Sequence, residues 1–456
     1  MNKRLAGALA LCLPLLACST APPRPVNPGI PVPSAWAASA SASAADRPGL
    51  WLEGFGDPVL SALVREALAN NFDLHAAAAR VAAARAQTRI EGAGRWPQLG
   101  LGTGYQRAQV TDSGYGSAQY GAFEVLFDLN WELDVWGRIA AGQRAAAQEQ
   151  AAAAADLDAA RLSLAARTAQ TYFELTEARL QVAVAEQSIH DRRTLVELVR
   201  GRFARGLTRG LDLRLALTDL ANAEALLALA RNQAQTASRR LETLLGRYPA
   251  GALSTGGGLP PPPGGLAAGL PSALLERRPD LNAAFERLRA ADSRLENAEK
   301  ALLPRIALTG SGGSRSAALA ELADPRSAVW NLATGLVQPL FTGGRLKGDI
   351  QLNEARVEEA LNGYRSSALA AFREVEQALA GEEWLKAQER ALREAVAQTK
   401  ASQKLAVYSY RLGFIEILTL LDSYRSTLTA QSAHLSAQRQ LLNNRIDLYL
   451  ALGGSV

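Results

Sequence analysis

The residue types that most often carry catalysis are sparse and scattered in this 456-residue chain. The three histidines, His75, His190 and His434, are far apart in helical patterns, and no two have the spacing of a zinc site. A G-x-G-x-G run at 100–104 lacks the continuation of a dinucleotide-binding loop and is more typical of a strand in which crowding is relieved. No nucleophile elbow is present. We therefore expect no catalytic residue, no metal and no cofactor.

Composition and charge narrow the class of protein further. The formal net charge is +5, and acidic and basic residues are mixed along the chain without the basic stripe of a nucleic-acid-binding protein. No stretch of eighteen apolar residues is present, so the sequence predicts no membrane-spanning helix. Membrane-spanning strands remain compatible with this composition, because their alternating pattern escapes hydropathy scans.

One cysteine lies where lipid chemistry is expected. A positively charged start and a short apolar stretch at 5–16 are typical of a secretory signal peptide. The small residues that end this stretch before Cys18 resemble the lipobox of bacterial lipoproteins, which implies cleavage after residue 17 and acylation of the thiol, palmitate included. Ser19 resembles the residue that directs such lipoproteins to the outer membrane. The alternative is an ordinary signal peptide in which Cys18 is incidental.

The segment after the predicted signal peptide is rich in Pro, Ala and Ser. It covers residues 18–50 and has no amphipathic period, which predicts an extended tether. Such a tether would connect a lipid on Cys18 to the body of the protein.

The body is an internal duplication. A shift of 207 residues, the separation between Arg138 and Arg345, aligns its two halves without a gap. Chance matching among Ala and Leu does not explain agreement at Pro and Gly positions. The sequence therefore predicts two repeats, at 51–248 and 273–456, joined by a Pro/Gly-rich linker at 249–272. The matched pairs include Pro97 with Pro304, Gly137 with Gly344, Gly206 with Gly413, and Gly246 with Gly453.

Each repeat contains two predicted strands separated by a turn. The clearest pattern runs from Phe123 to Asp134, where apolar and aromatic residues alternate with mostly acidic or amide residues. One face of that strand is therefore expected to be apolar and the other wet. In the first repeat, residues 106–119 are expected to form the turn. The predicted strands are at about 97–107, 120–135, 304–314 and 328–341.

Long helices make up most of the remaining sequence. Residues 143–200 contain neither Gly nor Pro, and a helix from about 138 to 203 would be roughly 100 Å long. A returning helix follows at 211–245, so the first repeat is expected to carry a helical hairpin at about 138–247. The second repeat is expected to carry its equivalent at about 345–453. A single helix is predicted at 58–93, before the first strand.

The strand count has a consequence if the strands lie in a membrane. Strands in lipid must close into a barrel, because an open edge leaves unpaired backbone groups in hydrocarbon. Barrels of this kind need about eight strands or more, whereas one chain supplies four. Two copies would give eight strands and three copies would give twelve. Membrane strands in this chain therefore require a shared barrel.

Two stretches, WELDVWGR at 131–138 and QPLFTGGR at 338–345, closely resemble the strand-to-helix junctions of the outer membrane factor family, the TolC/OprM-like channels of Gram-negative efflux pumps. RRPDL at 277–281 is similar to the start of that family's second half, and the resemblance covers about Trp51 to Gly453. It implies an α+β membrane protein whose homotrimer forms a twelve-stranded outer-membrane β-barrel continued by a periplasmic α-helical barrel. The lipobox resembles the NodT-like lipoprotein branch that serves RND-type pumps.

The resemblance also assigns roles to individual residues. The junction residues are Trp136, Gly137, Arg138, Gly343, Gly344 and Arg345. The residues at the hairpin tips, where a partner would dock, are Arg202, Arg205, Gly206, Arg209, Tyr410 and Gly413. The implied partners are further copies of the chain, outer-membrane lipid, a periplasmic membrane fusion (adaptor) protein and an inner-membrane RND-type pump. No nucleic acid is expected.

The family places a gate in the last hairpin, and the matching residues are Leu418, Asp422 and Arg425. Residues three and four apart lie on one helix face, so symmetry would turn Asp422 into a carboxylate ring and Leu418 into an apolar constriction. Arg425 is expected to pair with an acidic group on a neighbouring helix. Since the first repeat has no charge at the shifted positions, the charged gate is expected to belong to the second repeat alone. The alternative is an ordinary solvated ion pair between Asp422 and Arg425.

These features together predict a passive export channel in the outer membrane that extends into the periplasm. Alternatives are the outer-membrane duct of a type I protein secretion system and a non-conducting coiled-coil stalk. A stalk would show sustained heptads and no paired amphipathic strands. A simple porin would be dominated by strands, whereas helices dominate here.

Overall fold

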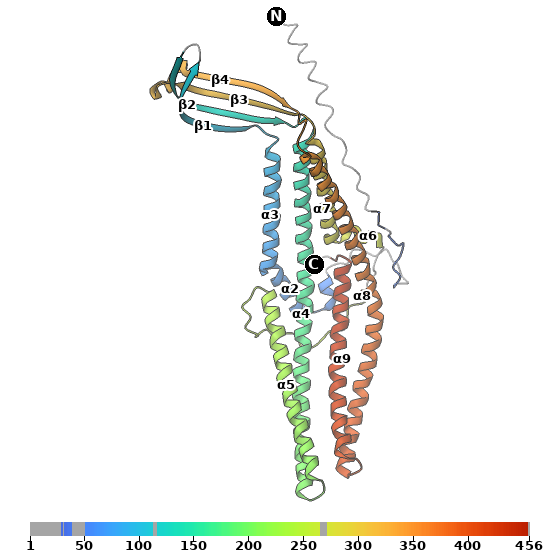
Figure 1. Ribbon diagram of the computed structural model, residues 1–456. Coiled ribbons are helices and arrows are strands. Elements are labelled where there is room, and N and C mark those ends of the chain that lie inside the picture. The colour runs from blue at the N-terminus through green and yellow to red at the C-terminus, as the bar shows by residue number, and fades with distance from the viewer. Residues whose placement is uncertain (1–28, 31, 39–50, 113–115, 265–270, 455–456) are drawn as a thin grey trace. The chain divides into compact units, whose positions relative to one another are not determined.

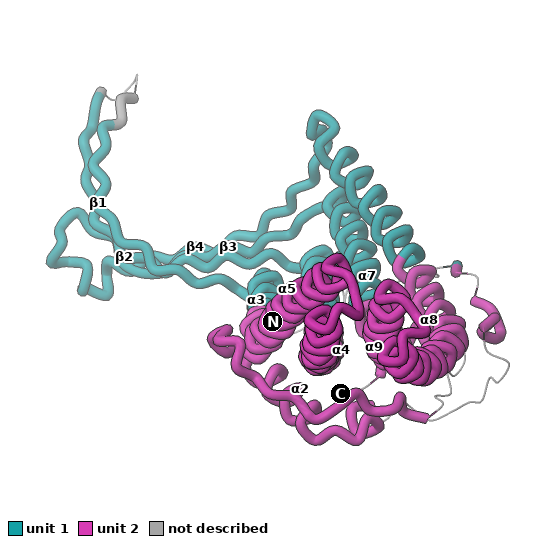
Figure 2. Tube along the Cα trace, turned by 90° about the horizontal axis from the view of Figure 1, so that it is seen from below, with its two compact units in different colours: residues 1–29, 79–154, 283–366 teal, residues 30–78, 155–282, 367–456 magenta. Residues whose placement is uncertain are grey.

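The computed structural model describes residues 29–30, 32–38, 51–112, 116–264 and 271–454. The predicted signal peptide and Cys18 lie outside these residues. The chain divides into two compact units, which are coloured separately in Figure 2. Unit 1 comprises 1–29, 79–154 and 283–366, and unit 2 comprises 30–78, 155–282 and 367–456. In the described part of the chain, no helix is long and apolar enough to cross a membrane.

The duplication is reproduced element by element (Figure 1). Helix α3 (Phe72–Ala93) corresponds to α7 (Pro279–Lys300), and α5 (Gly210–Leu244) corresponds to α9 (Ile417–Ala451), each at the same offset of 207. Helix α4 (Arg138–Ala204) likewise corresponds to α8 (Arg345–Leu412), and α2 (Pro58–Asn70) to the shorter α6 (Pro271–Arg277). A short 3-10 helix, η2 (Trp51–Phe55), precedes α2, and η3 (Leu319–Ala323) and η4 (Pro325–Ser327) precede the last strand.

Even single hydrogen bonds recur at this offset. Asn71 Nδ2 donates to the carbonyl of Leu244 over 3.0 Å, and Arg278 Nη1 donates to the carbonyl of Ala451 over 3.3 Å. Both side chains thus satisfy an orphan carbonyl at the end of the second hairpin helix of their repeat. Arg278 belongs to the RRPDL stretch and also pairs with Asp280 over 2.7 Å, which gives that stretch a structural role.

The single helix expected at 58–93 is wrong. It is broken into α2 and α3 at Asn71, whose backbone is extended with φ −69° and ψ 125°. The Asn71 side chain accepts a hydrogen bond from the Leu74 N–H over 3.1 Å, as an N-cap does. Because Asn can offer the backbone this local bond, it ends one helix and starts the next.

The four strands form one antiparallel sheet in the order β1-β2-β3-β4. They are β1 (Gln98–Asp112), β2 (Gly116–Leu133), β3 (Arg305–Ser316) and β4 (Ala328–Val337). The turn expected at 106–119 is wrong, because β1 and β2 stay paired from Gln98 with Asn130 out to Asp112 with Gly116. The polar residues of this stretch are typical of a turn, but here they pair across the strands: Arg107 and Gln109 both bond Gln119.

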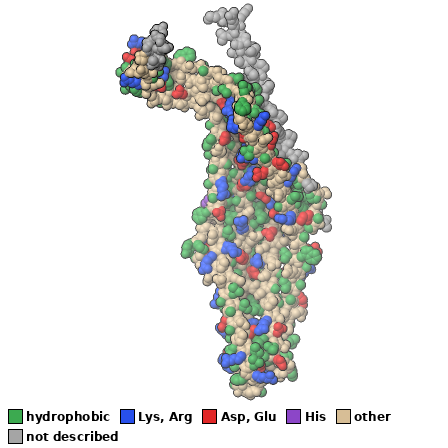
Figure 3. Space-filling model, viewed as in Figure 1, with side chains coloured by type: hydrophobic (Ala, Val, Ile, Leu, Met, Phe, Trp, Pro, Cys, Tyr) green, Lys and Arg blue, Asp and Glu red, His purple; other side chains and the backbone are tan. Residues whose placement is uncertain are grey.

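The long helices pack as hairpins in unit 2, α4 with α5 and α8 with α9 (Figures 1 and 2), and α5 also contacts α9. An alanine stripe with a seven-residue spacing is buried on α5 and lets the backbones approach closely. Arg240 of α5 pairs with Glu174 of α4 over 2.8 Å, and Asn444 of α9 donates to the Ala378 carbonyl of α8 over 2.9 Å. Charged side chains of both signs are interspersed over the hairpins (Figure 3). The stripe consists of Ala216, Ala223, Ala230 and Ala237.

Parts of the predicted tether and linker are held against unit 2. Trp36 is only 4% exposed and packs edge-on against Phe372 of α8, with ring centroids 6.1 Å apart. Glu376 accepts backbone N–H bonds from Ala37 and Ala38 over 2.7 and 2.9 Å. The tether is therefore not an unattached linker over its whole length. Composition pointed to an extended segment but could not show that one tryptophan finds a site on α8.

In the linker, Glu242 accepts backbone N–H bonds from Gly251 and Ala252 over 2.6 and 2.9 Å. Burial alone would raise the pKa of Glu242, but these bonds and that of Leu253 lower it below its ordinary value. The linker is fixed to the end of α5 by a carboxylate that stays ionised.

Gly246 at the end of α5 should not tolerate a side chain. Its φ is +73°, and a Cβ there would lie 2.6 Å from the Asn70 carbonyl oxygen. Gly246→Ala should lower the thermal midpoint of the detergent-solubilised protein, because the left-handed conformation alone costs on the order of 1–2 kcal/mol. Gly257→Ala is the matched control, since nothing lies within 4 Å of a Cβ there. Equal midpoints for both variants would contradict this account.

Candidate functional site

The register of the sheet in unit 1 gathers apolar side chains on one face. Leu101, Phe127 and Trp330 lie in one cross-strand row that passes Gly312, and neighbouring rows add further leucines. Leu99 is 70% exposed and Trp330 is 82% exposed. A contiguous apolar face of this kind on a folded chain marks a surface that meets an apolar environment.

The opposite face of the same sheet is polar. Glu124, Asp128 and Glu132 follow each other on β2 at every fourth position, and Glu124 pairs with Arg315 of β3 over 2.7 Å. The glycines of the 100–104 run lie across from this acidic row, and a Cβ on Gly102 would sit 3.2 Å from Asp128 Oδ2. The sheet therefore has an apolar side and a polar side.

Aromatic residues lie toward both ends of the apolar face. Tyr105 and Phe123 contact each other with ring centroids 4.5 Å apart, and beyond them the same face turns polar at Arg107. Toward the helices, Trp131 Nε1 donates to the Arg95 carbonyl over 3.0 Å. Aromatic side chains that border an apolar band are typical of strands crossing a membrane, where they lie at the headgroup level.

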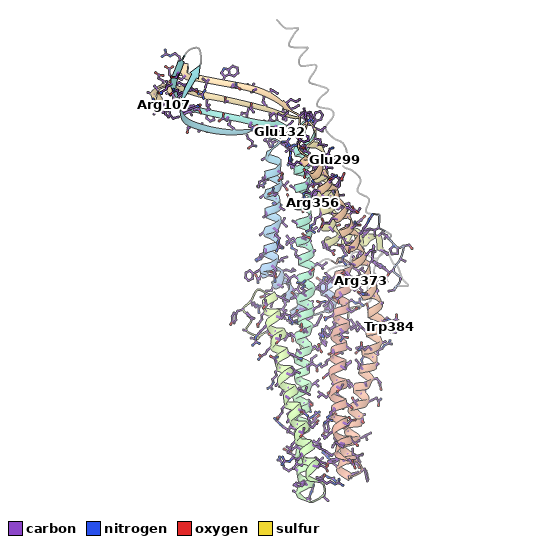
Figure 4. The ribbon with its side chains drawn as sticks, in the orientation of Figure 1. Arg107, Glu132, Glu299, Arg356, Arg373 and Trp384 are labelled. Carbon is purple, nitrogen blue, oxygen red and sulfur yellow. The ribbon has the colours of Figure 1, made fainter. Side chains whose placement is uncertain are left out.

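The predicted junction residues do form the strand-to-helix turns. Gly137 has a φ of +74° directly before Arg138, the first residue of α4, and Trp136 Nε1 donates to the Pro304 carbonyl over 2.7 Å. Arg138 pairs with Glu132 at the end of β2 over 2.9 Å (Figure 4 labels Glu132). Gly343 and Gly344 have φ of +59° and +88° directly before Arg345.

An acidic cap adds to the first junction. The Asp134 carboxylate accepts the Ile139 and Ala140 N–H groups over 2.9 and 2.7 Å, where the helix dipole favours a negative charge. This stabilises the start of α4 at the end of the sheet.

A buried charge cluster lies near the hairpin tips of unit 2. Asp219 of α5 is almost inaccessible, and its carboxylate pairs with Arg192 of α4 over 2.7 Å and with Arg425 of α9 over 3.2 Å. Arg192 is also buried, and its guanidinium lies 5.8 Å from the ring centroid of Tyr424. One carboxylate thus ties three helices from both repeats together.

The predicted gate residues form an exposed stripe on α9. Leu418 is 58% exposed, Asp422 is exposed, and within the described ranges no hydrogen bond or ion pair involves Asp422. The solvated pair of Asp422 with Arg425 is not formed, because Arg425 bonds Asp219 instead. The first repeat carries no charge at the equivalent positions, and its buried Asp219 reaches the stripe only through Arg425.

The six predicted tip residues divide into two groups. Gly206 and Gly413 end α4 and α8 with φ of +70° and +81°, and Arg205 and Arg209 are exposed. Arg202 and Tyr410 instead contact each other.

The contact of Arg202 and Tyr410 is internal to the chain. Tyr410 is buried, and Arg202 Nη1 donates to the carbonyls of Tyr410 and Arg411 over 3.1 and 3.0 Å at the end of α8. These two side chains therefore stabilise the tip itself, whereas the side chains of Arg205 and Arg209 are exposed.

Asp219 and Arg192 are the residues that sequence reasoning missed. Neither lies at a position equivalent to Leu418, Asp422 or Arg425, because those equivalents are Leu211, Leu215 and Thr218. The spacing of Asp219 was informative: it is three residues after Ala216 and four before Ala223, on the buried alanine stripe. A carboxylate on such a stripe must find a cation, since an unpaired buried charge is costly.

Groups of the kind that bind metals are not assembled in the part of the chain that the structure describes: no three His, Cys, Asp or Glu side chains could hold one ion. His434 bonds Glu389 over 2.9 Å, and His75 bonds the Ala69 carbonyl over 3.0 Å. Both histidines have structural partners.

Comparison with known proteins agrees with this geometry. The family model described as outer membrane efflux protein matches residues 63–247 and 270–454, once per repeat. The pyoverdine export outer membrane protein OpmQ of Pseudomonas putida is 34% identical over 460 residues, which cover 98% of this chain and 96% of that protein. Outer membrane protein OprJ of Pseudomonas aeruginosa is 35% identical over 464 residues, with 98% and 95% coverage.

A solved structure supports the same assignment. The outer-membrane channel OprN is 27% identical and superposes with a TM-score of 0.89 over 96% of this chain and 99% of its own. With two family matches, full-length relatives and a shared fold, the chain belongs to the outer membrane efflux protein family.

Proposed function

We propose that this protein is the outer-membrane channel of a tripartite efflux system, a passive duct that crosses the outer membrane and extends into the periplasm. The observation that carries the proposal is the two-faced sheet. Its exposed apolar face, with Leu99 and Trp330, suits lipid, and its face with Glu124 and Asp128 suits a water-filled lumen. A non-conducting stalk would have no use for this exposed apolar area.

The edges of the sheet support a homotrimer. Strands β1 and β4 are its two edges, so each has one side without a strand partner among the described residues. Unpaired N–H and C=O groups are too costly in hydrocarbon to remain open. When β1 of one copy pairs with β4 of the next, three copies close a twelve-stranded barrel, and the long hairpins then line an α-helical barrel in the periplasm.

The periplasmic gate is the exposed stripe of α9. Around a threefold axis, Asp422 forms a ring of carboxylates and Leu418 an apolar constriction, and Arg425 is braced by Asp219. An adaptor protein docked at the tips, with Arg205 and Arg209 as exposed contacts, opens the gate by drawing the hairpins apart. The inner-membrane partner is an RND-type pump, which supplies the energy, so the duct itself needs no cofactor.

Cys18 is the lipid attachment site in this proposal. Acylation there would anchor the chain in the outer membrane at the start of the tether that reaches Trp36. The alternative role, a duct for type I protein secretion, shares the barrel and the hairpins and differs in the partner. Co-purification of the tip-bound adaptor and its pump from membranes distinguishes these two systems.

The gate proposal predicts a conductance change. In planar lipid bilayers, Asp422→Ala should raise the leak conductance of the resting channel by about twofold or more, because a ring of bound or hydrated carboxylates is removed from the constriction. The control is Glu359→Ala, which removes an exposed carboxylate from a different helix, α8. If Asp422→Ala conducts like the unmodified protein, Asp422 does not belong to the gate.

Substitution of the buried Asp219 and of the exposed Arg425 should lower the stability of the tip by different amounts. Asp219→Asn leaves Arg192 buried without its anion, which typically costs about 3–5 kcal/mol. Arg425→Ala removes a mostly exposed partner and should cost less than about 1 kcal/mol. Hydrogen exchange of the tip residues and the thermal midpoint should therefore change far more for Asp219→Asn. The reverse order would show that the buried pair does not hold the tip.

A further inference from the structure

A cavity of about 450 Å³ lies between helices α4, α8 and α9 of unit 2. Its walls come from both repeats, because α4 belongs to the first repeat and α8 and α9 belong to the second (Figure 1). A volume of this size is typical of sites that hold a small organic molecule. The chemistry of its walls therefore indicates what kind of molecule would fit.

The wall formed by α4 presents a buried and fixed cation. Arg192 is 3% exposed, and its guanidinium donates through Nε to Asp219 over 2.7 Å and through Nη1 to the Ser188 carbonyl over 3.4 Å. Its Nη2 takes part in no hydrogen bond within the part of the chain that the structure describes. Because the other two nitrogens hold the guanidinium in place, this third donor is preorganised for an acceptor in the cavity.

The wall formed by α8 carries two lysines without a counter-ion. Lys400 and Lys404 lie one turn apart and are exposed. Among the described residues neither forms a hydrogen bond or an ion pair, whereas Lys386 and Arg393 of the same helix pair with carboxylates over 2.6 and 2.5 Å. Like charges four residues apart destabilise a helix. An anion bound at both ammonium groups would offset this repulsion.

The first repeat has no such pair of cations at the equivalent positions. Arg193 stands in place of Lys400 and Glu197 in place of Lys404, so the two charges there are opposite. Arg193 also pairs with Glu224 of α5 over 3.3 Å. The unpaired positive charge is therefore a feature of the second repeat and not of the scaffold that both repeats share.

The other charges of the cavity leave it with an excess of positive charge. Its charged lining consists of three cations and one carboxylate, Asp191. Gln187 donates to that carboxylate over 2.8 Å. Since Asp219 neutralises Arg192 and Asp191 offsets one lysine, one positive charge remains uncompensated.

The remaining wall is largely apolar. Val184 of α4, Val407 of α8 and Leu428 of α9 line the cavity beside the buried Tyr424. The ring of Tyr424 also lies 5.8 Å from the Arg192 guanidinium. A ligand needs an apolar part to cover these side chains as well as a negative charge to meet the lysines.

We propose that this cavity binds a small amphipathic organic anion, a carboxylate or sulfonate that carries one or two rings. The charged group meets Lys400 and Lys404, and a second acceptor of the ligand takes the free Nη2 donor of Arg192. The rings pack against Val184 and Leu428. This site differs from the exposed gate stripe of α9, and its binding chemistry does not depend on the proposed channel.

Binding has a mechanical consequence, which does rest on the proposed function. The ligand contacts α4 of one hairpin and α8 and α9 of the other, so it connects the two hairpins of the chain. In the proposed channel the gate opens when the hairpins are drawn apart. An occupied cavity therefore stabilises the closed tip.

Equilibrium dialysis of the full-length protein in detergent tests the binding site. The probe is naproxen, a naphthalene carboxylate, and its uncharged methyl ester is the matched compound. Naproxen should bind saturably with one molecule per chain. Lys400→Gln combined with Lys404→Gln should weaken this binding by about fivefold or more, because both ammonium groups that meet the carboxylate are lost. Arg390→Gln, which removes an exposed cation of α8 outside the cavity, should leave it unchanged.

Three results would overturn the site. They are the absence of saturable naproxen binding, equal affinity for the methyl ester, and equal loss of affinity in Arg390→Gln and in the double lysine variant. The substituted side chains are exposed, so the variants should fold, and an unchanged thermal midpoint without ligand verifies this.

Hydrogen exchange and single-channel recording test the consequence for the tip. Saturating naproxen should slow amide exchange at the tip ends of α4, α8 and α9 and lower the open probability, and both effects should be absent in the double lysine variant. If naproxen binds but exchange is unchanged, the ligand does not connect the hairpins, although the site stands. If the protein conducts no ions under any condition, the proposed channel fails while the dialysis result still decides the site.

Discussion

Every backbone N–H and C=O group of a strand in hydrocarbon needs a partner, and this requirement governs the rest of the molecule. The chain builds one sheet of four strands, with β1 and β4 as its edges. One sheet face is apolar and bordered by aromatic residues, and the other carries the acidic row of β2. In the proposed channel, four strands cannot close on themselves, so several copies of the chain would have to share one barrel.

The junctions transmit this arrangement to the helices. Gly137 and Gly344 take up a positive φ where a strand ends and a helix of more than sixty residues starts. Asp134 and Glu132 then fix the first turn of α4 through its N–H groups and Arg138.

Duplication with divergence explains how two similar halves take different roles. The repeats share the bounds of α3 with α7 and of α5 with α9, and the tip glycines, at one offset. They differ at the positions where function is proposed: Asp219 has a serine as its equivalent, Asp422 a leucine, and Lys404 a glutamate. The two hairpins therefore share one backbone scaffold and differ at a few charged or aromatic positions, which include the proposed gate.

The sequence by itself determined the features that arise from local periodicity. Alternation at 123–134 predicts a two-faced strand, the absence of Gly and Pro predicts long helices, and glycines at a constant offset predict the hairpin tips. Features that depend on distant partners were decided only by the tertiary structure. Asn71 is held at the break between α2 and α3 by its bond to the distant Leu244 carbonyl, and the ladder at Arg107 forms because β2 lies opposite. The same holds for Trp36 and Asp219. Trp36 lies in a proline-rich segment and gains its role by packing against Phe372, and Asp219 lies on an alanine stripe and gains its role by pairing with Arg192. Only folding brings these residues into contact.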